Sequence, residues 1–320
     1  MTETGPHHQS AAYGGEGWSP RKTRLSEELG KIWSDCGQNS EYAPLKRVLL
    51  HPPNGDMLAD EDDINRLQLL APVDVNRATE QHAAMAAAYA GADITVEWVR
   101  PQCSPVPFNL IFMADLFFMT PEGAILARPA SVVRAGEERE TAAGLARLGV
   151  PILRSVSGGG TFEGADAMWL DPQTVLLARG LRTNEEGIRQ VSAVLSEMGV
   201  ATIVVDLPHG TMHLMGMLRI VDRDLAVAWP KRLAHHAVNQ LAERGLKVAF
   251  IPDEAEAAGG AALNFVTVAP RHILMPAGNP LTMEFYEFLG ITCHTVEVDE
   301  IIKAAGAIGC LTGVLARERV

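Results

Sequence analysis

A pattern that recurs about every fifty residues limits what this chain can fold into more than any other feature of its sequence. Each copy reads as an apolar strand, a short turn containing Pro or Asp, a second apolar strand, a helix and a third strand. Four clear copies begin at Asp115, Ala167, Leu214 and Ala262. Such a period is typical of a closed array of supersecondary units that bury their apolar faces against one another.

A fifth copy precedes these four. It comprises a strand at residues 45–52, a helix near 78–89 and a strand at 94–99, and it carries an inserted acidic loop at 55–63. In the other copies the expected helices lie near residues 137–148, 184–198, 231–244 and 282–289. Five units therefore fit in one α/β domain.

The strands at residues 125–127 and 175–178 are apolar on both faces, which indicates burial from both sides by helices and neighbouring strands. A doubly wound open sheet is the rival architecture. It needs single strands alternating with helices and a Gly-rich loop after the first strand, and the sequence has neither. The glycine run at 158–160 lacks a GxGxxG or Walker context, so we expect no phosphate-bearing cofactor.

Residues 1–38 are rich in Gly, His, Ser and Glu and have little hydrophobic periodicity. They predict a mobile N-terminal arm with one weak helix near residues 25–33. A single domain is expected over residues 39–320, a length sufficient to bury a large core.

The formal net charge is −12, and no local run of Lys and Arg offers a phosphate-neutralising face. This charge argues against nucleic-acid and anionic-membrane partners and favours small cationic ones. It leaves the oligomeric state open, and a homo-oligomer is compatible with it.

The cysteines form no CxxC pair and no regular spacing, so neither a zinc site nor a disulfide framework is expected. They are Cys36, Cys103, Cys293 and Cys310. We find no secretory signal, and the small-apolar stretch at residues 83–92 is too short to span a bilayer. We therefore expect a cytoplasmic protein without a metal.

Polar residues stand where successive units begin. Asp115, Glu163, His213 and Cys310 each precede an apolar strand. In a ring of units, the loops that enter equivalent strands converge on the central axis. A thiol, an imidazole and two carboxylates would then meet in one funnel, which is the constellation required for covalent thiol catalysis.

Cys310 has the most telling local setting of the four cysteines. It follows Gly309 and precedes a turn that ends at Gly313, so the backbone can approach a ligand closely and present N–H groups to developing charge. The alternative is a small buried residue in a tight turn. Because His213 and Glu163 are expected beside it, we interpret Cys310 as a catalytic residue.

Other polar residues near the unit starts have two interpretations. Glu163 and Asp166 stand among small and apolar residues, so burial with a cationic partner is expected, but a turn-capping pair is the alternative. Asp115 and Asn109 could contact a substrate or bind local backbone.

Arg134 and Arg182 each follow the second strand of a unit. A guanidinium fork can clamp a substrate carboxylate with two parallel hydrogen bonds. The alternative is a surface arginine at a helix start, paired with a nearby Glu.

Taken together and in this order, these motifs over about residues 42–320 resemble those of the guanidino-group-modifying enzymes, which include arginine deiminases, dimethylarginine dimethylaminohydrolases and amidinotransferases. The resemblance implies a five-bladed α/β propeller, the pentein fold, and no cofactor. It also implies that Cys310 is the nucleophile, His213 the general acid and base, and Glu163 the carboxylate beside them.

The same resemblance implies the residues that hold the substrate. Asp115 matches the aspartate that grips the guanidinium, and Asn109 resembles a contact to the substrate backbone. Phe112 would line the pocket, although a core aromatic is an equal alternative. Arg134 and Arg182 fall where deiminases keep carboxylate-binding arginines.

The chain departs from this family at two positions. Met215 stands where deiminases and amidinotransferases usually have an acidic residue, and Ala114 where deiminases commonly have arginine. The extra helical domain of arginine deiminases is also missing, so the chain resembles the compact dimethylarginine hydrolases most. A hydrolase for arginine or an N-substituted arginine is expected, with an amidinotransferase or a non-catalytic binding propeller as alternatives.

Overall fold

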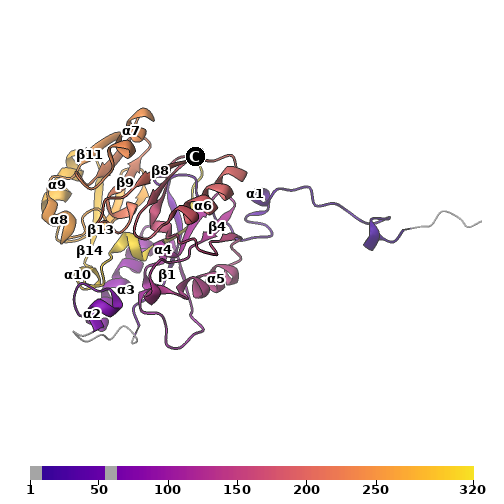
Figure 1. The fold of residues 1–320 in the computed structure, drawn as a ribbon, viewed down its shortest axis with the longest axis horizontal. Coiled ribbons are helices and arrows are strands. Elements are labelled where there is room, and N and C mark those ends of the chain that lie inside the picture. The colour runs from indigo at the N-terminus through magenta and orange to yellow at the C-terminus, as the bar shows by residue number, and fades with distance from the viewer. Residues whose placement is uncertain (1–8, 55–62) are drawn as a thin grey trace, which may run out of the picture.

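The computed structural model describes residues 9–54 and 63–320. Within these ranges the chain forms five three-stranded sheets with helices on the outside of the body (Figure 1). The predicted α/β class is confirmed. Apart from its last residue, Asp63, the acidic loop predicted at 55–63 lies outside the described residues.

Every sheet has the same construction. Its middle strand runs antiparallel to the first strand and parallel to the third. The sheets, in the order first, middle and third strand, are β15 (Gly313–Arg317), β1 (Leu45–Leu50) and β2 (Thr95–Trp98); β3 (Phe117–Thr120), β4 (Gly123–Leu126) and β5 (Ile152–Ser155); β6 (Ala167–Asp171), β7 (Thr174–Arg179) and β8 (Ala201–Asp206); β9 (Leu218–Asp222), β10 (Leu225–Ala228) and β11 (Lys247–Phe250); and β12 (Val266–Ala269), β13 (His272–Pro276) and β14 (Thr292–Val296).

One long helix leads from the middle to the third strand of each unit, as the repeat predicted. These helices are α3 (Val75–Gly91), α5 (Glu137–Arg147), α6 (Glu185–Glu197), α7 (His235–Glu243) and α9 (Pro280–Phe288). In the described ranges, no helix has the length and apolar character needed to cross a bilayer.

The C-terminal strand completes the first unit, which the sequence pattern did not predict. Strand β15 pairs with β1 from Leu45↔Arg317 to Leu49↔Gly313. The first sheet contacts the second, the fourth contacts the fifth, and the fifth contacts the first. Side chains of the third sheet pack against the second and the fourth. The first strands of all five sheets line one common cavity. The units therefore surround a shared centre.

Aromatic packing joins neighbouring units. Trp169 on β6 is fully buried and stacks on Phe118 of β3 with ring centroids 5.7 Å apart. Its indole N–H donates a hydrogen bond to the carbonyl of Met119 at 3.1 Å. The buried indole nitrogen of Trp169 thus has a hydrogen-bond partner inside the core.

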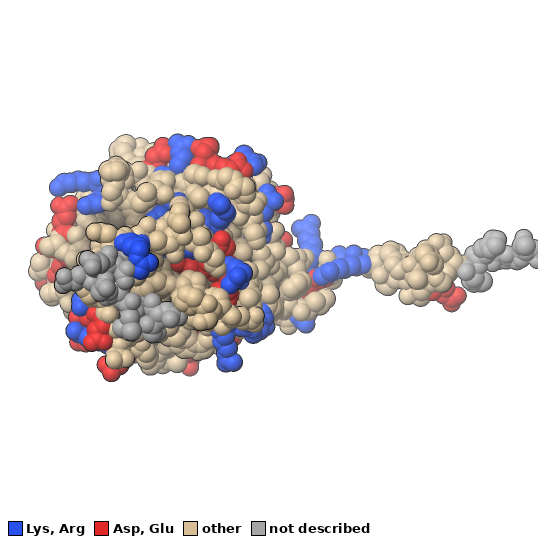
Figure 2. Space-filling model, turned by 60° about the horizontal axis from the view of Figure 1, so that its bottom comes forward, with Lys and Arg blue, Asp and Glu red and all other residues tan. Residues whose placement is uncertain are grey.

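The described part of the N-terminal segment extends away from the body (Figure 1), and the helix α1 within it covers Leu25–Glu28. The last residues of the predicted arm pack against the body: Ser34 donates its N–H to the carbonyl of Gly149 at 2.9 Å, and Cys36 is buried in the core. On the face shown in Figure 2, charges of both signs are scattered among uncharged side chains.

Helix α6 begins at a close contact that requires glycine. The side chain of Asn184 accepts hydrogen bonds from the N–H groups of Gly187 and Thr161 at 2.9 and 3.0 Å. A Cβ atom at Gly187 would lie 1.9 Å from the carbonyl oxygen of Thr161. Both clashing partners are backbone, so relief requires the helix to shift.

Substitution of this glycine tests the contact. We expect Gly187→Ala to lower the free energy of unfolding by about 1–3 kcal/mol, because overpacking outweighs the helix propensity of alanine. The control is Gly91→Ala in α3, where a Cβ meets nothing within 4 Å and stability should hold or rise. Urea denaturation measures both, and equal stability of the two variants would contradict the packing argument.

Candidate active site

The predicted reactive groups all lie at unit starts, where short helical turns lead into the first strands. Asp115 lies in α4 (Met113–Leu116) before β3, Glu163 just before the 3-10 turn η5 (Gly164–Asp166) and β6, His213 just before η6 (Leu214–Gly216) and β9, and Cys310 in α11 (Ile308–Leu311) before β15. All four side chains are buried.

Two cavities meet at Cys310. The imidazole cavity, of about 140 Å³, is lined by His213, Trp229, Asn264 and Cys310 among others. The carboxylate cavity, of about 20 Å³, brings together six predicted residues: Asn109, Phe112, Asp115, Arg134, Arg182 and Cys310. These six residues, which are spread along the chain from Asn109 to Cys310, therefore line the same small cavity.

Glu163 and His213 form a short buried pair, with Nε2 2.7 Å from a carboxylate oxygen. Burial disfavours charge on the imidazole, but Asp115, Glu163 and Asp166 outweigh it and raise the pKa of His213 to about 9. Burial likewise disfavours charge on Glu163, yet the His213 hydrogen bond and nearby arginines lower its pKa to about 2. The pair is therefore ionised at neutral pH, with the imidazolium donating.

Arg134 links the carboxylates of the site. Its guanidinium lies 2.6 Å from Asp115, 2.8 Å from Glu137 and 3.3 Å from Glu163. It was expected to clamp a substrate carboxylate, but here its donors are engaged by the protein's own acidic groups. Arg182 makes a longer contact, 3.4 Å, with Glu163.

One carboxylate oxygen of Asp115 faces the site without a hydrogen bond. Its Oδ2 accepts from Arg134, whereas Oδ1 is buried and has no hydrogen-bond partner among the described residues. The Nδ1 of His213 lies 3.8 Å from this oxygen. A buried carboxylate oxygen in this state is an open acceptor for an N–H donor.

Asp166 was also expected to contact substrate, and the structure supports its capping alternative instead. It is fully buried and lines neither cavity. One oxygen accepts from the hydroxyl of Thr183 at 2.7 Å and the other from the N–H of Leu214 at 3.1 Å. It thus fastens the turn that follows His213 to the neighbouring unit.

Asn264 was missed by the sequence reasoning and holds Cys310 at two atoms. Its amide nitrogen lies 3.0 Å from the sulfur, and its oxygen accepts the backbone N–H of Cys310 at 3.1 Å. Asn264 stands two residues before β12, at the start of the fifth unit. The rule that polar residues at unit starts face the centre, which led us to the other candidate site residues, would therefore also have predicted Asn264.

The surroundings of Cys310 disfavour its thiolate in the unliganded site. Burial and the Asp115 carboxylate raise the pKa of Cys310, against the opposing effects of Asn264 and Arg219. A cation bound beside the sulfur would oppose the effect of Asp115 and favour the thiolate. The reactivity of this cysteine is thus expected to depend on the charge of its ligand.

Donor atoms of Asp115, Glu163 and His213 lie within 4.8 Å of one another, close enough to hold a metal ion. Arg134, however, already donates to both carboxylates, and His213 donates to Glu163. The protein's own cations therefore supply the positive charge that a metal would bring to these groups.

Residues 101–258 match the family model described as arginine deiminase. The chain is 28% identical over 243 residues to N(G),N(G)-dimethylarginine dimethylaminohydrolase of Pseudomonas aeruginosa, which covers 76% of this chain and 90% of that protein. A solved dimethylarginine dimethylaminohydrolase, an adduct with 4-chloro-2-hydroxymethylpyridine, superposes with a TM-score of 0.71 at 25% identity, covering 86% of this chain and 100% of the other.

An amidinotransferase from Microseira wollei, of a saxitoxin biosynthetic pathway, has the same fold. Its TM-score is 0.72 at 15% sequence identity, covering 88% of this chain and 97% of the other.

The His213 pair makes a prediction about stability and pH. The pKa of His213 is about 9 in the folded protein and 6.5 in the unfolded chain. The protonated imidazole therefore contributes fully to the free energy of unfolding below pH 6.5, and this contribution is lost as the pH rises through 9. The expected loss is on the order of 3 kcal/mol. His213→Gln should remove this part of the pH dependence, whereas the exposed control His236→Gln should keep it. Unfolding free energies from pH 6 to 10 that coincide for both variants would contradict the charge assignment.

Proposed function

We propose that this chain, a member of the guanidino-group-modifying enzymes, is a hydrolase that breaks a C–N bond in the guanidino group of arginine or an N-substituted arginine-like compound. The products are a ureido compound, such as citrulline, and ammonia or an amine. Dimethylarginine dimethylaminohydrolases are prominent among the relatives. The substrate assignment itself rests on the site.

The observation that carries the proposal is the open oxygen of Asp115. It is buried, lacks a hydrogen-bond partner among the described residues, and belongs to a residue that lines the same cavity as Cys310. A substrate guanidinium can donate a charge-assisted N–H bond to this one oxygen, and its charge repays the desolvation of the carboxylate. Such a ligand would place its central carbon near the sulfur.

In the proposed reaction, the bound cation favours the thiolate of Cys310, which releases its proton to solvent. The sulfur forms a bond to the guanidino carbon, and the C–N bond breaks as His213 gives its proton to the departing amine. The amidino group remains on the sulfur as a thiouronium. The neutral imidazole then takes a proton from water, the resulting hydroxide adds to the carbon, and the thiolate leaves with the C–S electron pair.

The neighbouring residues have supporting roles in this proposal. Glu163 holds the imidazole and stabilises its protonated form, and Arg134 fixes Asp115 and Glu163 relative to each other. Arg182, whose guanidinium makes the long contact with Glu163 and no other ion pair within residues 9–54 and 63–320, is the proposed clamp for a substrate carboxylate. Asn109 and Phe112 line the same cavity and would contact the rest of the substrate.

The architecture that goes with this function is a five-bladed α/β propeller spanning residues 39–320. Support comes from five sheets of equal construction, from contacts that run round to the first sheet again, and from a cavity lined by all five first strands. The cytoplasm is the proposed location, because the four cysteines are free.

Mass spectrometry with a panel of guanidines tests the activity. Arginine, N-methylated arginines and shorter guanidines are each incubated with the protein, with and without glycine as an acceptor. A ureido product without glycine is expected; a new guanidine formed only with glycine would instead identify an amidinotransferase. No turnover of any guanidine would favour a binding protein.

The nucleophile is tested by replacing two cysteines separately. Cys310→Ser should abolish turnover while the melting temperature stays close to that of the wild type, because the hydroxyl is a far weaker nucleophile. The half-buried Cys103 lies outside both cavities, so Cys103→Ser should retain activity. Full activity in Cys310→Ser would reject the assignment.

The guanidinium acceptor is tested by removing one charge. Asp115→Asn should lower kcat/KM by about 100-fold, since a charge-assisted pair becomes a neutral one. The exposed Glu243→Gln is the control for loss of one negative charge and should leave kcat/KM unchanged. A normal value for Asp115→Asn, in a variant that melts like the wild type, would exclude this contact.

A further inference from the structure

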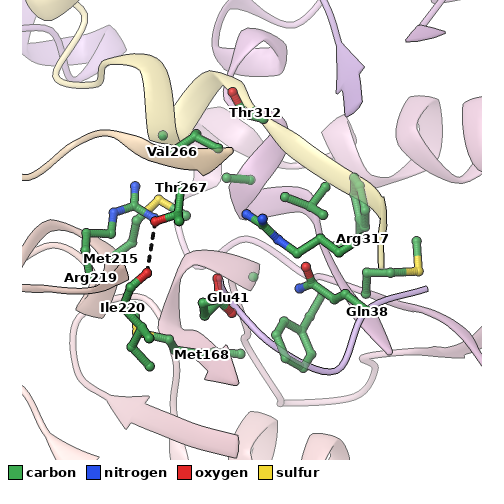
Figure 3. A pocket seen from close by; sticks show the side chains of 18 residues that line it. Gln38, Glu41, Met168, Met215, Arg219, Ile220, Val266, Thr267, Thr312 and Arg317 are labelled. Carbon is green, nitrogen blue, oxygen red and sulfur yellow. Dashed lines mark hydrogen bonds between the residues drawn. The ribbon is translucent and has the colours of Figure 1, made fainter. Parts of the chain in front are cut away.

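A third cavity lies on the common centre of the five units, behind the turn that carries Cys310. This axial cavity has a volume of about 60 Å³ and is lined by residues of all five first strands (Figure 3). Gly309 and Thr312, on either side of the turn that bears the thiol, belong to its wall, and Met215 lines both this cavity and the imidazole cavity. The mechanism proposed above uses none of its space.

Two buried arginines point into the axial cavity. Figure 3 shows the guanidinium groups of Arg219 and Arg317 entering from opposite sides. Their exposed fractions are 8% and 6%, and neither forms an ion pair with a carboxylate in the described part of the chain. Burial lowers the pKa of Arg219 to about 10, which leaves it charged at neutral pH.

Hydrogen bonds within the protein leave donors of both groups unused. Arg219 donates through Nε to the carbonyl of Leu263 at 3.1 Å, and Arg317 donates through Nη1 to the carbonyl of Ala43 at 2.8 Å. The buried Nη2 of Arg219 and Nε of Arg317 have no partner in residues 9–54 and 63–320. Both guanidiniums of this cavity therefore keep N–H donors without a partner in the described chain.

Only one acidic residue lines this cavity. Glu41 accepts the backbone N–H of Trp169 at 3.0 Å and lies more than an ion-pair distance from both guanidiniums. Two guanidiniums therefore face one carboxylate, and burial raises the pKa of Glu41, which disfavours its charged form. At least one positive charge is left without a partner. An uncompensated buried charge is costly, and one monovalent anion would cancel it.

The volume agrees with an ion of that kind. A cavity needs about 10–15 Å³ of such space to hold one water molecule. The axial cavity therefore has room for one monatomic or small inorganic anion together with water.

We propose that the axial cavity binds one small monovalent inorganic anion, of the size of chloride, between the guanidiniums of Arg219 and Arg317. The site is separate from the proposed substrate site and does not depend on the reaction assigned to it. Arg219 lies against the turn of the thiol, since a Cβ at Gly309 would fall 1.8 Å from its Nη2. The anion therefore sits directly behind the backbone that carries Cys310.

Bromide locates the ion in a crystal of the wild-type protein, because its anomalous scattering distinguishes it from water. The expected result is one anomalous peak in the axial cavity, within hydrogen-bonding distance of both guanidiniums. Peaks confined to the surface, or none, would overturn the proposal. This measurement needs no variant and so does not depend on how a substitution affects folding.

A chloride titration in solution tests the arginines. At constant ionic strength, with gluconate replacing chloride, the melting temperature should rise and saturate, as expected for an ion that binds the native state. Arg317→Met should weaken the response at least tenfold in chloride concentration, whereas Arg319→Met, an exposed neighbour on the same segment, should leave it unchanged. An equal response in the two variants, or a linear one in the wild type, would refute the site.

Discussion

The charge network centred on Arg134 holds the whole site together. This guanidinium joins Asp115, at the start of the second unit, to Glu163, at the start of the third, and Glu163 in turn binds His213, at the start of the fourth. Each group is buried, so each depends on its partners for compensation. Because the partners come from different units, the network also fixes how those units meet at the centre.

The repeat made most of the fold predictable, because each unit is built from local signals: two apolar strands, a turn and an amphipathic helix. The boundaries of α6 match the helix expected near residues 184–198 to within one residue at each end. No local sequence signal predicts the pairing of β15 with β1, because these strands lie at opposite ends of the domain in the sequence. The burial of Cys36 escaped prediction for the same reason.

For the site, the positions at unit starts predicted that Cys310, His213, Glu163 and Asp115 would lie together. Asn264 also stands at a unit start, but the sequence analysis did not consider it. Side-chain pairing was harder to predict. The partners of Arg134 and the capping bonds of Asp166 follow from which units are adjacent, and composition around each residue does not contain that information. The apolar Met215 lines both the axial cavity and the imidazole cavity, at the position where the resemblance led us to expect an acidic residue.

The closure of the first sheet by β15 has a consequence for biosynthesis. Leu45 pairs with Arg317, so the first sheet lacks its strand β15 until nearly all of the remaining polypeptide has been translated. Cys310 is made only a few codons before this closure. A ribosome-bound nascent chain can therefore display folded units without possessing the assembled centre, and the unpaired edge of β1 must be shielded from other chains until then.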